Sequence, residues 1–74
     1  MDKTAFGQNL RNLREDADLS QAALAKKLHM TQRKISYLEC GKYEPSLGDI
    51  IAFCRFFQVS TDLLLGISGT LCGQ

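Results

Sequence analysis

Apolar positions recur at helical spacing along most of the chain. In the first segment Phe6, Leu10, Leu13 and Ala17 follow one another every three or four residues, which places them on one face of a helix. Thr4 is expected to cap the start of this helix. No run of residues shows the sustained alternation typical of a strand. The pattern therefore predicts an all-α fold.

Four further helices are predicted from polar caps followed by apolar series. A second helix is expected after Ser20 and a third after Thr31, because both side chains can cap a helix N-terminus. A fourth follows Ser46, with Asp49 three residues later in a capping-box pattern, and a short fifth follows Ser60. The inward residues expected are Leu24, Ala25 and Leu28 of the second helix, Ile35 and Leu38 of the third, and Leu47, Ile50, Ile51, Cys54 and Phe57 of the fourth; the fifth carries Leu63 and Leu64.

The ends of these helices define the domain. Gly41 suits the left-handed conformation that follows a helix, and Pro45 cannot continue one, so both mark the end of the third helix. Gly66 is expected to end the fifth. Residues 1–66 are therefore predicted to form one domain, and residues 67–74 a frayed C-terminal tail with little to bury.

Size and composition exclude several classes of protein. The chain has 74 residues, of which 45% are hydrophobic and 23% charged, as in ordinary globular domains. It is too short for a barrel enzyme or a doubly wound nucleotide-binding fold. No apolar run approaches the roughly 20 residues of a transmembrane helix, and the N-terminus does not resemble a secretory signal. The three cysteines, Cys40, Cys54 and Cys72, lack CxxC spacing, which argues against a disulfide framework or a zinc site and fits a reducing cytoplasm.

The formal net charge of +1 conceals a local basic segment. Between Lys26 and Lys42 the chain has five basic residues and one acidic residue, Glu39. Such a segment can bind a polyanion. A solvated helix face has the same charge pattern, so charge alone leaves both interpretations open.

The second and third helices are separated only by His29 and Met30. So short a connection makes two helices cross steeply, as in a helix-turn-helix, with a small residue such as Ala25 at the crossing. The N-terminal part of the third helix is then expected to face outward. Its outward side chains are Gln32, Arg33, Lys34, Ser36 and Tyr37. Gln pairs with adenine and Arg with guanine in the major groove, so these residue types suit contact with DNA.

Taken together, three stretches of the chain resemble the Cro/cI-like (XRE) helix-turn-helix regulators of phages and bacteria. They are FGQNLRNLRE, LSQAALAKKLHMTQRKISYLECGKYEPS and LGDIIAFCRFFQVSTDLLLG, and the resemblance covers about residues 4 to 66. It implies a compact five-helix, lambda-repressor-like DNA-binding domain with its helix-turn-helix at about residues 20–40. It further implies that the third helix enters the major groove of double-stranded DNA, usually within a homodimer on a pseudo-palindrome.

The resemblance also implies roles for particular residues. Gln21 matches a phosphate-binding glutamine that braces the first glutamine of the recognition helix, here Gln32. Arg14 and Glu39 match a structural ion pair between the first and third helices. The implied base-reading residues are Gln32, Arg33, Tyr37 and Ser36, and the implied phosphate-binding residues are Gln21, Ser20, Lys34, Lys42 and Tyr43.

The sequence departs from the family pattern at the turn, where His29 stands in place of the usual glycine. A positive φ is expected there, which His adopts less readily than Gly. Cys54 is expected to fill the core, whereas Cys40 could be either a bystander or a redox switch beside the DNA. The candidates for a dimer interface are Phe56, Leu63, Leu65 and Ile67.

These observations predict a sequence-specific transcriptional regulator, most simply a repressor that excludes polymerase from its operator. No arrangement of nucleophile, acid and base suggests an enzyme, and no metal, cofactor, membrane or small-molecule substrate is indicated. Two alternatives remain: an antitoxin-like or other protein-binding module, and the DNA-binding fragment of a longer ligand-sensing regulator.

Overall fold

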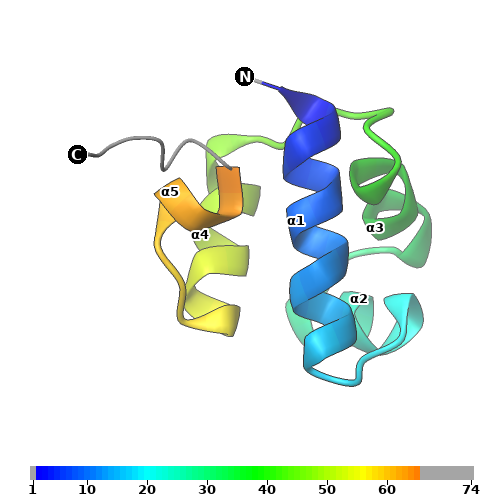
Figure 1. Ribbon diagram of the computed structural model, residues 1–74. Helices are drawn as coiled ribbons and strands as arrows, with labels where there is room; N and C mark the ends of the chain where they lie inside the picture. Colours follow the sequence, from blue (N-terminus) through cyan, green and yellow to red (C-terminus); the bar gives the residue numbers. More distant parts are fainter. Residues whose placement is uncertain (1, 66–74) are drawn as a thin grey trace.

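Helix α1 (Lys3–Asp16) stands between the other four helices of the computed structural model, which describes residues 2–65 (Figure 1). Helices α2 (Gln21–Leu28) and α3 (Gln32–Glu39) lie on one side of α1, and α4 (Leu47–Phe57) and α5 (Thr61–Leu65) on the other. The all-α, five-helix prediction is confirmed for this part of the chain. No helix within residues 2–65 has the length and apolar character needed to cross a membrane. The predicted tail, 67–74, and the predicted stop at Gly66 lie outside the described residues.

The core lies where α1 meets the other helices. Its fully or almost fully buried apolar residues are Phe6, Leu10, Leu24, Ala25, Ile35, Leu38, Phe53 and Leu64. The rings of Phe6 and Phe53 join α1 to α4, with their centroids 6.1 Å apart. All the inward positions predicted for α2 and α3 belong to this core or pack against it.

The predicted inward face of α4 is partly wrong. Phe53 is fully buried, whereas Leu47 is 73% exposed and Ile51 41% exposed. Ile50, Cys54 and Phe57 are half-buried and pack against the core, as expected. Most of α4 is apolar, so its sequence is compatible with more than one rotation about the helix axis. Ala17, at the end of α1, is likewise exposed rather than inward.

Most of the predicted helix caps are present. Asp2, not Thr4, caps α1: its Oδ1 accepts hydrogen bonds from the N–H groups of Thr4 (2.9 Å) and Ala5 (3.2 Å). Asp2 lies one position before the helix, so its carboxylate reaches both free N–H groups, which the side chain of Thr4, already inside the helix, cannot do. The other caps are as predicted: Ser20, Thr31 and Ser60 each accept from the N–H three residues later, and Ser46 and Asp49 form a reciprocal capping box.

Gly7 allows α1 to approach the C-terminal end of α3 very closely. A Cβ atom at this position would lie 2.4 Å from the Glu39 carbonyl oxygen and 2.5 Å from that of Leu38. Such distances are far shorter than a van der Waals contact, so only glycine fits. The contact fixes where α3 ends relative to α1, and it therefore helps to set the orientation of the helix-turn-helix.

Candidate nucleic-acid interface

The turn between α2 and α3 has the conformation that the sequence predicts. His29 follows α2 with φ 57° and ψ 39°, in the left-handed region. The Met30 N–H donates to the Ala25 carbonyl oxygen over 2.8 Å, which closes the end of α2. Ala25 itself is only 3% exposed. The small side chain therefore lies inside the crossing of the two helices.

Helix α3 presents one apolar and one polar side. Ile35 and Leu38 are buried and hold the helix against the core. Gln32 and Arg33 at its first turn are exposed, and Ser36 one turn later is half-buried. This arrangement leaves side chains that can donate to base edges on the outer side of a rigidly held helix.

Lys34 contacts the protein itself. Its Nζ lies 2.9 Å from Oδ1 of Asp49, which forms the capping box of α4 with Ser46, and ties α3 to the start of that helix. Burial acts to raise the pKa of Asp49, but the hydrogen bonds from Lys34 and from the Ser46 backbone outweigh it and hold this pKa below its ordinary value. Lys34 was predicted to bind phosphate. In the free protein its charge already has a partner, which sequence reasoning did not detect.

The start of α2 is connected to the end of α3 through a side-chain network. The Gln21 Nε2 donates to Oε1 of Glu39 over 3.1 Å. Within the described residues no hydrogen bond joins Gln21 to Gln32, the partner implied by the family resemblance. The charged carboxylate of Glu39 is a stronger acceptor than a neutral amide, which accounts for the difference.

Arg14 and Glu39 form a nearly buried ion pair at the centre of this network. The Arg14 Nε and Nη2 donate to the two Glu39 carboxylate oxygens over 2.6 and 3.1 Å, and Nη1 donates to the Leu19 carbonyl over 2.8 Å. The side chains of Arg14 and Glu39 are 11% and 4% exposed. The hydrogen bond to Glu39 raises the pKa of Arg14. The pair thus links α1, the α1–α2 connection and α3.

The loop after α3 folds back on Tyr37. The N–H groups of Lys42 and Tyr43 both point to the Tyr37 carbonyl oxygen, over 2.9 and 3.4 Å, and Gly41 makes the reversal possible with φ 75°. The Tyr43 ring meets the Tyr37 ring edge-on, with centroids 4.9 Å apart, and the Lys42 Nζ lies 4.9 Å from the Tyr37 ring centre. Nothing in the sequence pattern pointed to this cluster.

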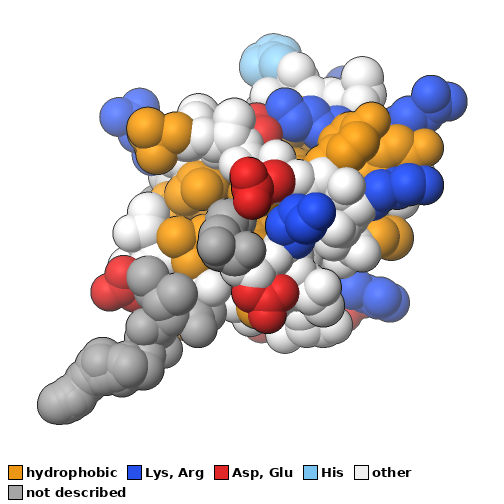
Figure 2. Space-filling view, turned by 90° about the horizontal axis from the view of Figure 1, so that it is seen from above, with side chains coloured by type: hydrophobic (Ala, Val, Ile, Leu, Met, Phe, Trp, Pro, Cys, Tyr) orange, Lys and Arg blue, Asp and Glu red, His pale blue; other side chains and the backbone are white. Residues whose placement is uncertain are grey.

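The basic side chains are unevenly distributed over the surface. Figure 2 shows Lys and Arg side chains gathered at its right-hand side, where Figure 1 places α2 and α3. The Asp and Glu side chains visible in this view lie mainly toward its middle and left. The helix-turn-helix is therefore on a basic side of the molecule, which suits an approach to the phosphate backbone of a nucleic acid.

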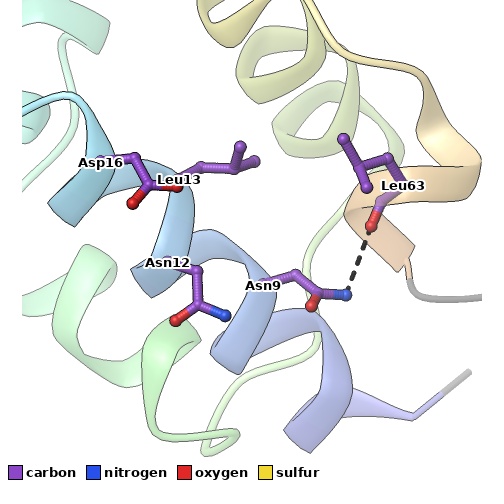
Figure 3. Close-up of a pocket in the computed structure, with 5 residues that line it drawn as sticks. All are labelled: Asn9, Asn12, Leu13, Asp16 and Leu63. Atoms are coloured by element: carbon purple, nitrogen blue, oxygen red, sulfur yellow. Dashed lines mark hydrogen bonds between the residues drawn. The ribbon is translucent and has the colours of Figure 1, made fainter.

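A separate hollow lies between α1 and α5, on the side of α1 away from α3. It has a volume of about 260 Å³ and is lined by Asn9, Asn12, Leu13, Asp16 and Leu63 (Figure 3). Asn9 donates to the carbonyl oxygens of Leu63 and Leu64 over 3.3 and 3.1 Å. Its amide therefore satisfies the C-terminal end of α5 and holds that helix against α1.

The two cysteines of the described residues, Cys40 and Cys54, are free thiols in different surroundings. Cys54 is half-buried against the core, as expected, and burial raises the pKa of its thiol, which keeps it in the less reactive protonated form. Cys40 is exposed at the end of α3. Cys72 lies outside the described residues, as does Ile67. Within residues 2–65 no group of three or more His, Cys, Asp or Glu side chains is arranged to hold a metal ion.

Comparison with known proteins places this geometry in a family. The family described as "Helix-turn-helix domain" matches residues 5–65, which include all of α2, α3, α4 and α5 and nearly all of α1. The chain belongs to this helix-turn-helix family. The match agrees with the Cro/cI-like resemblance, and the chain is a DNA-binding domain of the kind found in transcriptional regulators.

Individual relatives agree with this assignment. The HTH-type transcriptional activator BcrR of Enterococcus faecalis is 35% identical over 60 residues, which are 81% of this chain but only 29% of BcrR. The restriction-modification controller protein C.AhdI of Aeromonas hydrophila is 30% identical with a TM-score of 0.78, over 85% of this chain and 96% of that one. The clp gene regulator ClgR of Corynebacterium glutamicum is 27% identical with a TM-score of 0.78, over 88% and 85%.

Proposed function

We propose that this domain binds specific sequences in double-stranded DNA, as a homodimer, with α3 in the major groove. One observation carries the proposal: α3 is held against the core by Ile35 and Leu38 while Gln32 and Arg33 project from its first turn. A helix fixed in this way can enter the major groove without reorganisation, and its two exposed side chains have the donors and acceptors that distinguish bases.

The proposed contacts divide into two groups. Gln32 and Arg33 read base edges, with Ser36 one turn further along α3. Phosphates on one side of α3 meet Ser20 and Gln21 at the N-terminus of α2, where free N–H groups and the helix dipole favour an anion. On the other side, phosphates meet the segment of Lys42 and Tyr43. Lys34 is the weaker phosphate contact, because a phosphate must compete for its ammonium with the Asp49 carboxylate.

Dimerisation and the direction of regulation complete the proposal. Phe56 is 36% exposed and Leu63 52% exposed, so both can contribute apolar surface to an interface between two copies.

A dimer on its operator would exclude polymerase and act as a repressor. BcrR is named an activator, and this chain spans 29% of its length, so the direction of regulation needs its own test in a promoter–reporter assay. The proposal includes no catalytic activity and no cofactor.

The proposal is tested by selecting bound duplexes from a random library at near-physiological salt, because low salt favours non-specific binding. We expect a pseudo-palindrome with half-sites about one helical turn, roughly 34–36 Å, apart. Arg33→Ala should then lose its preference at one base pair in each half-site, and each lost contact should weaken the binding free energy by about 1–3 kcal/mol. Arg55→Ala, which removes an exposed cation from the far end of α4, is the matched control and should leave the preference unchanged. If no sequence is enriched, the proposal fails and the search for partners should turn to proteins.

A further inference from the structure

The sequence predicts Tyr37 as a base-reading residue, but its surroundings indicate another role. We propose that Tyr37 is a positioning residue: its ring and carbonyl group hold the loop after α3 so that the Lys42 ammonium is placed for a DNA phosphate. This inference rests on the proposed DNA-binding function and deepens it. It assigns Tyr37 to the affinity of the domain for the DNA backbone rather than to the choice of sequence.

The backbone of the loop supports this role first. Two consecutive N–H groups, those of Lys42 and Tyr43, are directed at the carbonyl oxygen of Tyr37. The chain reverses at Gly41, whose φ of 75° brings these groups back over the last turns of α3. Lys42 is therefore tied to the recognition helix through its own backbone N–H group.

The side chains hold the same arrangement. The Lys42 Nζ lies 4.9 Å from the Tyr37 ring centre, within the range of about 6 Å for a cation–π contact. The Tyr43 ring packs on the Tyr37 ring at an interplanar angle of 86°, the edge-to-face geometry that aromatic pairs prefer. Tyr37 is thus in contact with both residues of this loop that are proposed to meet phosphate, Lys42 and Tyr43.

This packing limits what Tyr37 can do at a base. Its side chain is half-buried, while Lys42 and Tyr43 are exposed.

An exposed lysine side chain that makes no contacts samples many rotamers, and ordering it on a phosphate costs conformational entropy. The contact with the Tyr37 ring restricts the rotamers of Lys42 before DNA binds. The ring face accepts no hydrogen bond from the ammonium group, so all three N–H donors remain available for a phosphate oxygen.

Two substitutions separate the ring from the hydroxyl. Tyr37→Phe keeps the ring and removes the hydroxyl, whereas Tyr37→Leu removes the ring but keeps an apolar side chain with good helix propensity. If Tyr37 positions Lys42, the Phe variant should behave as wild type and the Leu variant as Lys42→Ala. If Tyr37 reads a base through its hydroxyl, the Phe variant should already lose a sequence preference.

The first readout needs no DNA. In the proton NMR spectrum of the free protein, the ε-methylene protons of Lys42 should be shifted upfield by the Tyr37 ring. The shift should persist in Tyr37→Phe and disappear in Tyr37→Leu, with thermal melting used to verify that both variants are folded. An unshifted Lys42 in the wild-type protein would overturn the inference.

The second readout is the salt dependence of binding to the selected duplex and to an unrelated duplex, measured by fluorescence anisotropy. Each phosphate contact contributes about 0.9 to the magnitude of the slope of log K against log salt, so losing one contact per protomer reduces this magnitude by about 1.8 for the homodimer. We expect this change for Tyr37→Leu and Lys42→Ala on both duplexes, no further change in their double variant, and wild-type behaviour for Tyr37→Phe. An unchanged slope in Tyr37→Leu, or a lost base preference in Tyr37→Phe, would overturn the inference while DNA binding stands. A wild-type protein that binds neither duplex would overturn the proposed function and the phosphate role with it, whatever the NMR result.

Discussion

The ion pair between Arg14 and Glu39 leads to a quantitative prediction for Glu39→Ala. The Glu39 carboxylate accepts three hydrogen bonds, two from Arg14 and one from Gln21, and its side chain is 4% exposed. Truncation to alanine removes all three acceptor contacts. The Arg14 guanidinium would keep only its bond to the Leu19 carbonyl, in a site that water reaches poorly.

The size of the effect follows from this burial. Breaking a buried ion pair from one side costs about 3–5 kcal/mol, and the remaining exposure of Arg14 places this pair near the lower end. A domain of this length has a stability of about 4–11 kcal/mol at roughly 0.05–0.15 kcal/mol per residue. A loss of about 3 kcal/mol, at about 4–8 °C per kcal/mol for a domain of this size, lowers Tm by about 12–24 °C.

Thermal and urea unfolding of the variant measure this loss, and a second ion pair in the chain supplies the control. Arg11 and Glu15 are joined over 3.1 Å on the surface of α1, with both side chains more than half exposed. Exposed pairs contribute about 0–1 kcal/mol, so Glu15→Ala should change Tm little. The double variant Arg14→Ala/Glu39→Ala should lose less stability than the two single variants together, because neither partner is then left alone.

The opposite pattern would refute the structural role of this pair. If Glu39→Ala kept the wild-type Tm and urea midpoint but lost DNA affinity, Glu39 would act at the interface rather than in the fold. We expect instead that the folded fraction of the variant retains the wild-type sequence preference when binding is measured well below its reduced Tm.

Three further outcomes are expected from the structure. Gly7→Ala should destabilise the domain by about 1–3 kcal/mol, because the new methyl group meets the Glu39 carbonyl; an unchanged urea midpoint would contradict this. His29→Gly should raise the free energy of unfolding by about 1 kcal/mol, because glycine adopts the left-handed conformation without strain; chemical denaturation with an unchanged or lower midpoint would refute it. The lowered pKa of Asp49 means that its contribution to stability is complete above its unfolded pKa of about 3.9 and is lost as the pH falls through the folded value. Urea unfolding between about pH 2 and 6 should therefore show a smaller acid loss of stability in Asp49→Asn than in wild type.

The sequence was sufficient to predict the features that depend on near neighbours. Four of the five predicted helix caps (all but Thr4), the turn at His29 and the reversal at Gly41 follow from side chains within three or four residues of the backbone groups they serve. The buried residues of α2 and α3 were predictable for a related reason: each of these helices has a narrow apolar face, so only one rotation about its axis buries it.

The features that sequence reasoning missed depend on contacts between distant segments. The wide apolar surface of α4 left its rotation open, and the burial of Phe53 is decided by Phe6, more than forty positions earlier in the chain. The need for glycine at position 7 appears only when α1 lies on the end of α3. Gln21 donates its hydrogen bond to Glu39 rather than to Gln32, because the fold brings the Glu39 carboxylate within reach of its side-chain amide. No local pattern encodes these choices.

These contacts also change how many cations of the basic segment, residues 26–42, are available to bind DNA. Counting residues between Lys26 and Lys42 suggests five cations available for DNA, but Lys34 already bonds to Asp49 and Lys42 lies on the Tyr37 ring. The two interactions differ in their effect on binding. A phosphate that takes Lys34 must compete with a carboxylate, whose lowered pKa keeps it charged, whereas a phosphate that takes Lys42 competes only with a ring face. We therefore expect Lys42→Ala to lower the salt slope of DNA binding more than Lys34→Ala, and the loss of stability in Lys34→Ala to exceed that in Lys42→Ala. Equal slopes for the two variants would show that the Lys34–Asp49 pair opens freely on DNA.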